Sequence, residues 1–204
     1  MLACADSILD PDGPAYSEEF YAFLDEGFDS CSNVDELTDF ILWRCHSRDM
    51  LKAVVYLHGQ IDIYDWLVIL GNVWCNPDCF SDHRDDLVEI LKDSLENPFT
   101  TIRKLMNAEE NVGYDKLTEL ITIYRGCCPA TKNGLSWSLS REEALKFAWR
   151  SRYGARPILL TATISKHRAA AFKLERDEQE VIVVDLPESC WTEEYIPRPA
   201  DWGK

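Results

Sequence analysis

The spacing of apolar residues changes near residue 120, and this change constrains the fold more than any other feature. Before it, apolar side chains recur every three or four residues, as on the buried face of a helix. The stretches with this spacing are 18–28, 34–45 and 62–74. After it, residues 120–124 and 135–139 alternate between apolar and polar side chains, which is typical of strands. We therefore predict an α+β protein, with a helical N-terminal module over residues 1–112 and a mixed domain over 113–204.

Local signals predict further elements on both sides of this seam. Ser81 can cap a helix that stops near Asn97, where a proline follows. Ser140 and Glu143 have the spacing of a capping box, which would open a helix that ends before Gly154. The remaining apolar stretches, predicted as strands, are 157–164, 169–174 and 180–185.

Acidic residues are concentrated in the helical module. Residues 1–112 contain 7 Lys and Arg against 23 Asp and Glu, a net charge of −16, whereas residues 113–204 have a net charge of +1. An acidic surface repels phosphate backbones, so the first half is a poor candidate for nucleic-acid binding. The basic residues of the second half leave room for an anionic ligand there.

Neither a membrane span nor a secretory signal is visible in the sequence. The longest purely apolar runs, such as 66–70, are far shorter than the roughly 20 residues that a span needs. The first residues lack the basic and apolar regions of a signal peptide. We therefore expect a cytoplasmic protein that does not contact membranes.

The eight cysteines are best interpreted as free thiols, as expected in a reducing compartment. Cys75, Cys79 and His83 recur every four residues, and Cys45 upstream is a further candidate zinc ligand. The usual Cys-x2-Cys pair is missing, and Pro77 interrupts any single helix through them. Structural cysteines are therefore favoured over a metal site.

Three motifs in the second half point to one chemistry. Arg125 ends the first predicted strand, Ser-Trp-Ser lies on the second at 136–138, and Glu-Gln-Glu at 178–180 leads into the last apolar strand. In this order they resemble the Arg / Ser-x-Ser / Glu-x-Glu signature of mono-ADP-ribosyltransferases of the R-S-E class. The resemblance covers about residues 120–186 and implies an ADP-ribosyltransferase-like split β-sandwich that uses NAD⁺. The tryptophan departs from the family, which usually has Thr or Ser there.

The resemblance and the chemistry of NAD⁺ cleavage together assign roles to these residues. The Glu180 carboxylate would stabilise the oxocarbenium-like charge that develops on the ribose, and Ser136 would hold that carboxylate in place. Arg125 would bind the NAD⁺ phosphates through its planar guanidinium. Gly126 would leave room for backbone hydrogen bonds to the nicotinamide amide. The other candidates for NAD⁺ binding are Ser138, Arg150 and Arg152.

The first glutamate of the last motif bears on the acceptor. On an extended chain Glu178 and Glu180 would project to the same side, so Glu178 could act as the base for the acceptor. In the R-S-E family a glutamate at this position accompanies arginine acceptors. We therefore expect transfer of ADP-ribose to an arginine of a host protein, with release of nicotinamide and without a metal, as in a phage effector or bacterial toxin.

Other interpretations remain open. The acceptor could be RNA or DNA, or the enzyme could hydrolyse NAD⁺. A non-catalytic acidic interaction protein is a third interpretation, because of the charge on the first half. In an enzyme, the acidic module could dock a basic target, bind a neutralising partner or cover the active site.

Overall fold

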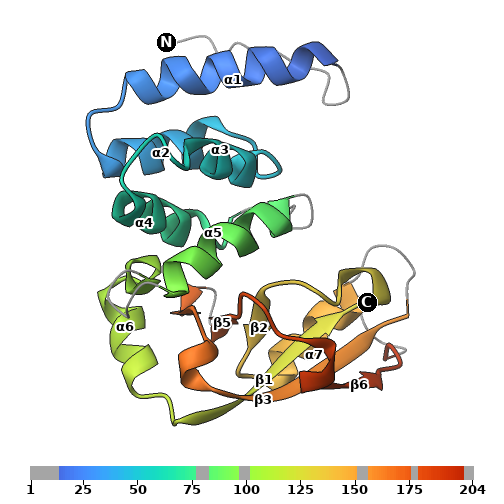
Figure 1. Ribbon diagram of the computed structural model, residues 1–204. Coiled ribbons are helices and arrows are strands. Elements are labelled where there is room, and N and C mark those ends of the chain that lie inside the picture. The colour runs from blue at the N-terminus through green and yellow to red at the C-terminus, as the bar shows by residue number, and fades with distance from the viewer. Residues whose placement is uncertain (1–13, 77–82, 97–101, 151–155, 176–178, 200–204) are drawn as a thin grey trace.

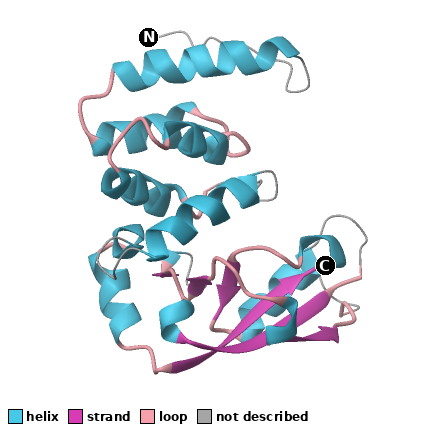
Figure 2. Cartoon of the chain, viewed as in Figure 1, coloured by secondary structure: helices cyan, strands magenta, loops and turns pink. Residues whose placement is uncertain are grey.

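The molecule combines a stack of helices with one antiparallel sheet, so the predicted α+β class is confirmed (Figures 1 and 2). The structure is a computed structural model that describes residues 14–76, 83–96, 102–150, 156–175 and 179–199. Figure 1 shows the helices in tiers, with α1 farthest from the sheet and α5 close to it. Among the described helices, none is both long and apolar enough to cross a membrane.

Within the described residues, six α-helices precede the sheet. They are α1 (Pro14–Asp29), α2 (Val34–Arg44), α3 (Met50–Leu57), α4 (Ile63–Val73), α5 (Arg84–Glu96) and α6 (Ala108–Asp115). The helices predicted over 18–28, 34–45 and 62–74 are confirmed as α1, α2 and α4. The end of α5 agrees with the predicted stop near Asn97, whereas its predicted cap, Ser81, lies outside the described residues. The helix α3 was not predicted.

Side-chain caps explain where several helices begin. The Asn33 side chain accepts a hydrogen bond from the Glu36 amide at 3.0 Å and starts α2. The Asp62 side chain accepts from the Tyr64 amide at 2.8 Å and starts α4. A reciprocal capping box, between Asn107 and a glutamate three residues later, starts α6.

The sheet has six strands in the order β4-β5-β2-β1-β3-β6, and every neighbouring pair is antiparallel. The strands are β1 (Leu120–Cys127), β2 (Ser136–Ser138), β3 (Ile158–Ser165), β4 (Ala171–Lys173), β5 (Glu180–Ile182) and β6 (Trp191–Tyr195). The first five were predicted, and β6 was not. β1 and β3 pair along their full length, whereas β1 and β2 share one registered pair, Tyr124 with Ser138. This narrow joint separates a β4-β5-β2 group from a β1-β3-β6 group.

A seventh helix, α7 (Arg141–Arg150), packs on β1 and was predicted. Half of its predicted capping box is present, because the Ser140 hydroxyl accepts from the Glu143 amide at 3.3 Å. The reciprocal half is wrong, since the Ser140 amide donates to the Ser138 hydroxyl and the Glu143 carboxylate binds Lys146.

The apolar core runs through both halves of the chain. One cluster of buried side chains includes residues of α1–α5 as well as residues of β1, β3, β4 and β5. The predicted seam between residues 112 and 113 falls inside α6. Near it, the Lys173 ammonium on β4 lies 2.8 Å from the Glu110 carboxylate on α6, with both side chains buried. The division into two domains at residue 112 stays a prediction.

Candidate functional site

Residues of the predicted motifs meet around one small pocket, which we call the sheet pocket. Its volume is about 140 Å³, and its walls come from β1, β2, β5 and α7. Five predicted site residues line it: Arg125, Gly126, Ser136, Ser138 and Glu180. The other lining residues are Tyr124, Trp137, Ala144 and Phe147. The structure therefore brings together parts of all three motifs.

The Arg125 guanidinium binds the connection between β1 and β2. Its Nη1 donates to the Ser136 carbonyl at 2.5 Å, and its Nη2 and Nε donate to the Thr131 carbonyl at 3.0 and 3.3 Å. Gly134 allows this approach, because a Cβ atom there would lie 1.8 Å from Nη2. Burial lowers the pKa of Arg125, and the nearby Glu180 carboxylate opposes this shift. An arginine stays protonated in proteins at neutral pH, so this side chain is a cation. The three bonds use only three of its five N–H groups.

The register of the sheet decides which serine lies nearer to Glu180. Ser138 is directly opposite Glu180, whereas Ser136 is opposite Ile182. Directly opposed residues have Cβ atoms about 5 Å apart, and diagonal ones are about 7–8 Å apart. The serine next to the carboxylate is therefore Ser138, and its hydroxyl also accepts from the Ser140 amide at 2.9 Å.

The Glu180 carboxylate is held from the helical half. Its side chain is buried, with 8% exposed, and its Oε1 accepts a hydrogen bond from the Trp74 indole Nε1 at 2.7 Å. The Cys75 Sγ lies 3.9 Å from the other oxygen, Oε2. We predicted that Ser136 would hold this carboxylate. Among the hydrogen bonds of the described residues, the indole takes that part, and sequence reasoning missed Trp74 because it is one apolar residue among several at the end of a helix.

Gly126 has a structural reason that differs from the predicted one. A Cβ atom at this position would lie 1.7 Å from the Ala144 carbonyl oxygen and 2.6 Å from the Ala148 amide nitrogen. Both atoms belong to the backbone of α7, which therefore needs a glycine on β1 to pack this closely. We had predicted that Gly126 leaves room for the nicotinamide amide.

Three other predicted site residues are placed less fully. Glu178 and Arg152 lie outside the described residues. Arg150 ends α7 at the surface, and its guanidinium lies over the ring of Phe147, which lines the sheet pocket, at 5.5 Å. Gln179 has φ 45°, so the extended chain that we predicted there is wrong. The expectation that Glu178 and Glu180 share a side loses its basis, because alternation requires extended backbone.

The described cysteines are free thiols, as predicted. Burial raises the pKa of Cys127 to about 11, so this thiol is neutral near pH 7 and is a poor nucleophile. Burial and the charge of Glu180 also raise the pKa of Cys75. Cys79, one of the three residues considered as metal ligands, lies outside the described residues. Among the residues that the structure describes, no group of three or more His, Cys, Asp and Glu side chains could hold a metal ion.

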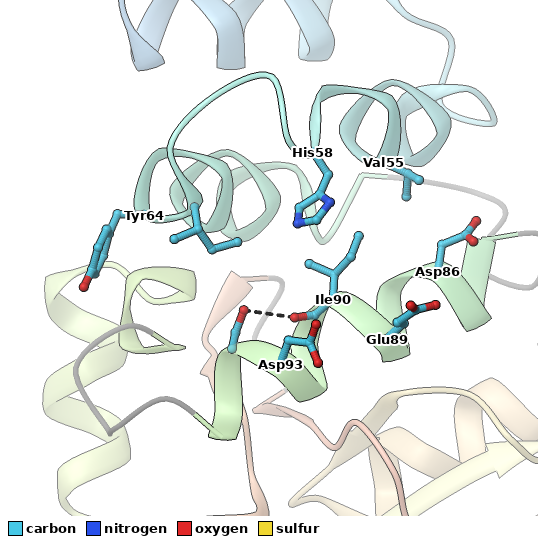
Figure 3. Close-up of a pocket in the computed structure, with 9 residues that line it drawn as sticks. Val55, His58, Tyr64, Asp86, Glu89, Ile90 and Asp93 are labelled. Carbon is cyan, nitrogen blue, oxygen red and sulfur yellow. Dashed lines mark hydrogen bonds between the residues drawn. The ribbon is translucent and has the colours of Figure 1, made fainter.

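A second cavity, which we call the helical groove, lies between α3, α4 and α5 (Figure 3). Its volume is about 630 Å³. Val55 and His58 lie across it from α5, which carries Ile90 and the acidic side chains, and Tyr64 lies at one end (Figure 3). The apolar lining residues are Val55, Ile63 and Ile90, and the acidic ones are Asp86, Glu89 and Asp93.

Comparison with protein-family models, with curated proteins and with solved structures gave no match to this chain.

Proposed function

We propose that this chain is an NAD⁺-dependent mono-ADP-ribosyltransferase of the R-S-E class. The observation that carries the proposal is the meeting of Arg125, Ser138 and Glu180, from three different strands, at the sheet pocket. A cation, a hydroxyl and a carboxylate in one small pocket suit a substrate that has phosphates, a ribose and a cationic ring. The single registered pair between β1 and β2 supports the finer proposal of an ADP-ribosyltransferase-like split β-sandwich.

In the proposed reaction NAD⁺ is a substrate that is consumed. The bond between the nicotinamide nitrogen and the ribose carbon breaks, and its electron pair leaves with nicotinamide. The Glu180 carboxylate stabilises the positive charge that develops on the ribose. An acceptor nitrogen forms the new bond to the same carbon and loses a proton to a base, for which Glu178 is the candidate. By resemblance the acceptor is an arginine of a host protein.

The size of the sheet pocket limits how much of NAD⁺ it can take. Pockets that enclose drug-sized ligands are about 300–1,000 Å³, whereas this pocket is about 140 Å³. We therefore expect it to receive one end of the dinucleotide. The remainder would extend over the surface, where Arg150 and Arg152 are candidates for the phosphates. No metal enters this proposal, and the proposed setting is the cytoplasm.

The test uses purified protein and NAD⁺ labelled on the adenylate phosphate, mixed with a bacterial lysate. Glu180→Gln removes the charge in the pocket, and Glu194→Gln on β6 is the matched control at an exposed position. Label in protein that is lost only with Glu180→Gln supports the proposal. Label in RNA or DNA retains the enzyme class and changes the acceptor, and free ADP-ribose alone indicates an NAD⁺ hydrolase. Intact NAD⁺ in every sample would refute the proposal.

A second function, binding of a lysine- or arginine-rich protein segment, is proposed for the helical groove. Its apolar lining suits the alkyl stems of such side chains, and its acidic residues suit their charged ends. This partner would be a docked basic target or a neutralising protein, two of the roles left open for the acidic first half.

Titration with a decalysine peptide tests this second function. Replacing Asp86, Glu89 and Asp93 together by lysine should abolish binding. The control replaces three exposed acidic residues of α1 by lysine and thus changes the net charge equally; these are Glu18, Glu19 and Glu26. Equal losses in both triple variants would mean that only net charge matters, and the groove would not be a binding site.

A further inference from the structure

We propose that Trp74 is a positioning residue that orients the Glu180 carboxylate, so that the helical half completes the active site. This inference rests on the proposed function. The two residues are 106 positions apart in the chain, and their side chains meet through a buried hydrogen bond of 2.7 Å. The indole N–H can only donate, and hydrogen bonds to a charged acceptor are stronger than neutral ones.

The surroundings of Glu180 make the indole its main described partner. Lys173 is directly opposite Glu180 in the register of β4 and β5 and would be the natural counter-charge. Its ammonium is bound elsewhere, however, at 2.8 Å from the Glu110 carboxylate and 3.2 Å from the Leu105 carbonyl. The Cys75 thiol, at 3.9 Å, is a weak donor. Among the described contacts, the indole is therefore the strongest hydrogen-bond donor to this carboxylate.

The packing of Trp74 favours positioning over a movable cover. Only 1% of this residue is exposed, and it belongs to the same core cluster as Val181 and Ile182 of β5. Lifting the helical half away would break this core and the buried pair of Glu110 with Lys173. The bond to Trp74 is thus a fixed part of the site. One carboxylate oxygen is held by the indole, and the residue still lines the sheet pocket.

The chain offers a closely matched control for this role. Trp66 lies on α4, is fully buried and donates its indole N–H at 2.7 Å to the Val54 carbonyl. Trp74→Phe and Trp66→Phe therefore remove the same group, an indole N–H in a buried hydrogen bond of 2.7 Å, from opposite ends of α4. They differ in the acceptor, which is the candidate catalytic carboxylate only for Trp74.

Steady-state nicotinamide release should separate the two variants. For Trp74→Phe we expect kcat to fall about tenfold or more while KM for NAD⁺ changes less than about twofold. The reason is that the Glu180 carboxylate acts mainly in the transition state, so its misplacement affects kcat more than substrate binding. Trp66→Phe should keep both constants near those of the wild type. Equal losses in the two variants would overturn the positioning role and indicate a merely structural tryptophan.

An NMR measurement tests the contact independently of activity. In the ¹H–¹⁵N spectrum, Glu180→Gln should shift the indole resonance of Trp74 and leave that of Trp66 unchanged. An unchanged Trp74 resonance would overturn the inference, even if Trp74→Phe does not fold. A wild-type protein that releases no nicotinamide would overturn the proposed function and, with that function, the catalytic role of the contact between Trp74 and Glu180. The indole resonance would still report whether this contact exists.

Discussion

Replacement of Lys173 by methionine should destabilise the protein strongly, because it breaks an ion pair that water does not reach. The exposed fractions of the Lys173 and Glu110 side chains are 2% and 0%, and their charged atoms are 2.8 Å apart. Without the ammonium, the Glu110 carboxylate keeps two amide donors, Asn107 at 2.9 Å and Leu174 at 3.3 Å. It loses its counter-charge in the interior.

Removing one partner of a buried ion pair costs about 3–5 kcal/mol. We expect Lys173→Met to lie near the lower end, about 3 kcal/mol, because the two amides still solvate Glu110. Adding Glu110→Gln should restore part of the loss, since the uncompensated charge is then gone.

Urea denaturation at pH 7, followed by tryptophan fluorescence, measures both variants. Lys92→Met is the control, because Lys92 on α5 pairs with Asp185 at 2.7 Å while both side chains are about half exposed. Its expected cost is below about 1 kcal/mol. A cost this small for Lys173→Met would refute the reasoning that a buried charge pair joins the helices to the sheet.

Three further predictions concern glycines, buried thiols and Arg125. Gly126→Ala should lower the free energy of unfolding, measured with urea, by about 3 kcal/mol, because its Cβ would lie 1.7 Å from an α7 carbonyl oxygen. The control Gly59→Ala, at φ 83° with open space around it, should cost about 1 kcal/mol. Stability should fall as pH rises above 9, because burial raises the pKa of Cys45 to about 12 and of Cys127 to about 11 from 9.0, so the unfolded thiols ionise first. Each thiol then lowers the free energy of unfolding by about 1.4 kcal/mol per pH unit, up to its folded pKa. Cys127→Ala should remove the contribution of Cys127. A constant free energy of unfolding from about pH 9 to 11 would contradict this prediction. Arg125→Lys should lower the free energy of unfolding by about 1–3 kcal/mol and raise KM for NAD⁺, because a lysine ammonium lacks the planar fork that makes the three guanidinium bonds. An unchanged KM would show that Arg125 is not part of the binding site.

The elements that sequence reasoning found are those with a local signal. The spacing of apolar residues located α1, α2, α4 and α5, and alternation located β1 and β2. The helix α3 is short and five of its eight residues are buried, so the sequence has little of the polar face that makes a helix recognisable. The strand β6 is mostly exposed and is defined by its backbone pairing with β3, which no local pattern reveals.

The same limit applies to the site. Arg125, Ser138 and Glu180 could be located because each lies at a strand with a short motif. Which serine faces Glu180 depends on the register of β2 with β5, and the Trp74 contact joins residues 106 positions apart. Both follow from the packing of the whole chain. The role of Gly126 likewise depends on how α7 packs on β1.

The rate of nicotinamide release from NAD⁺, measured for the wild type and for Glu180→Gln, tests the central proposal most directly. Removing a preorganised charge that stabilises a transition state costs about 10²–10³ in rate, so the variant should be slower by that factor. A melting temperature like that of the wild type would show that the variant is folded. Equal rates in the two proteins would contradict the role of Glu180, and a wild type that leaves NAD⁺ intact would contradict the proposed transferase.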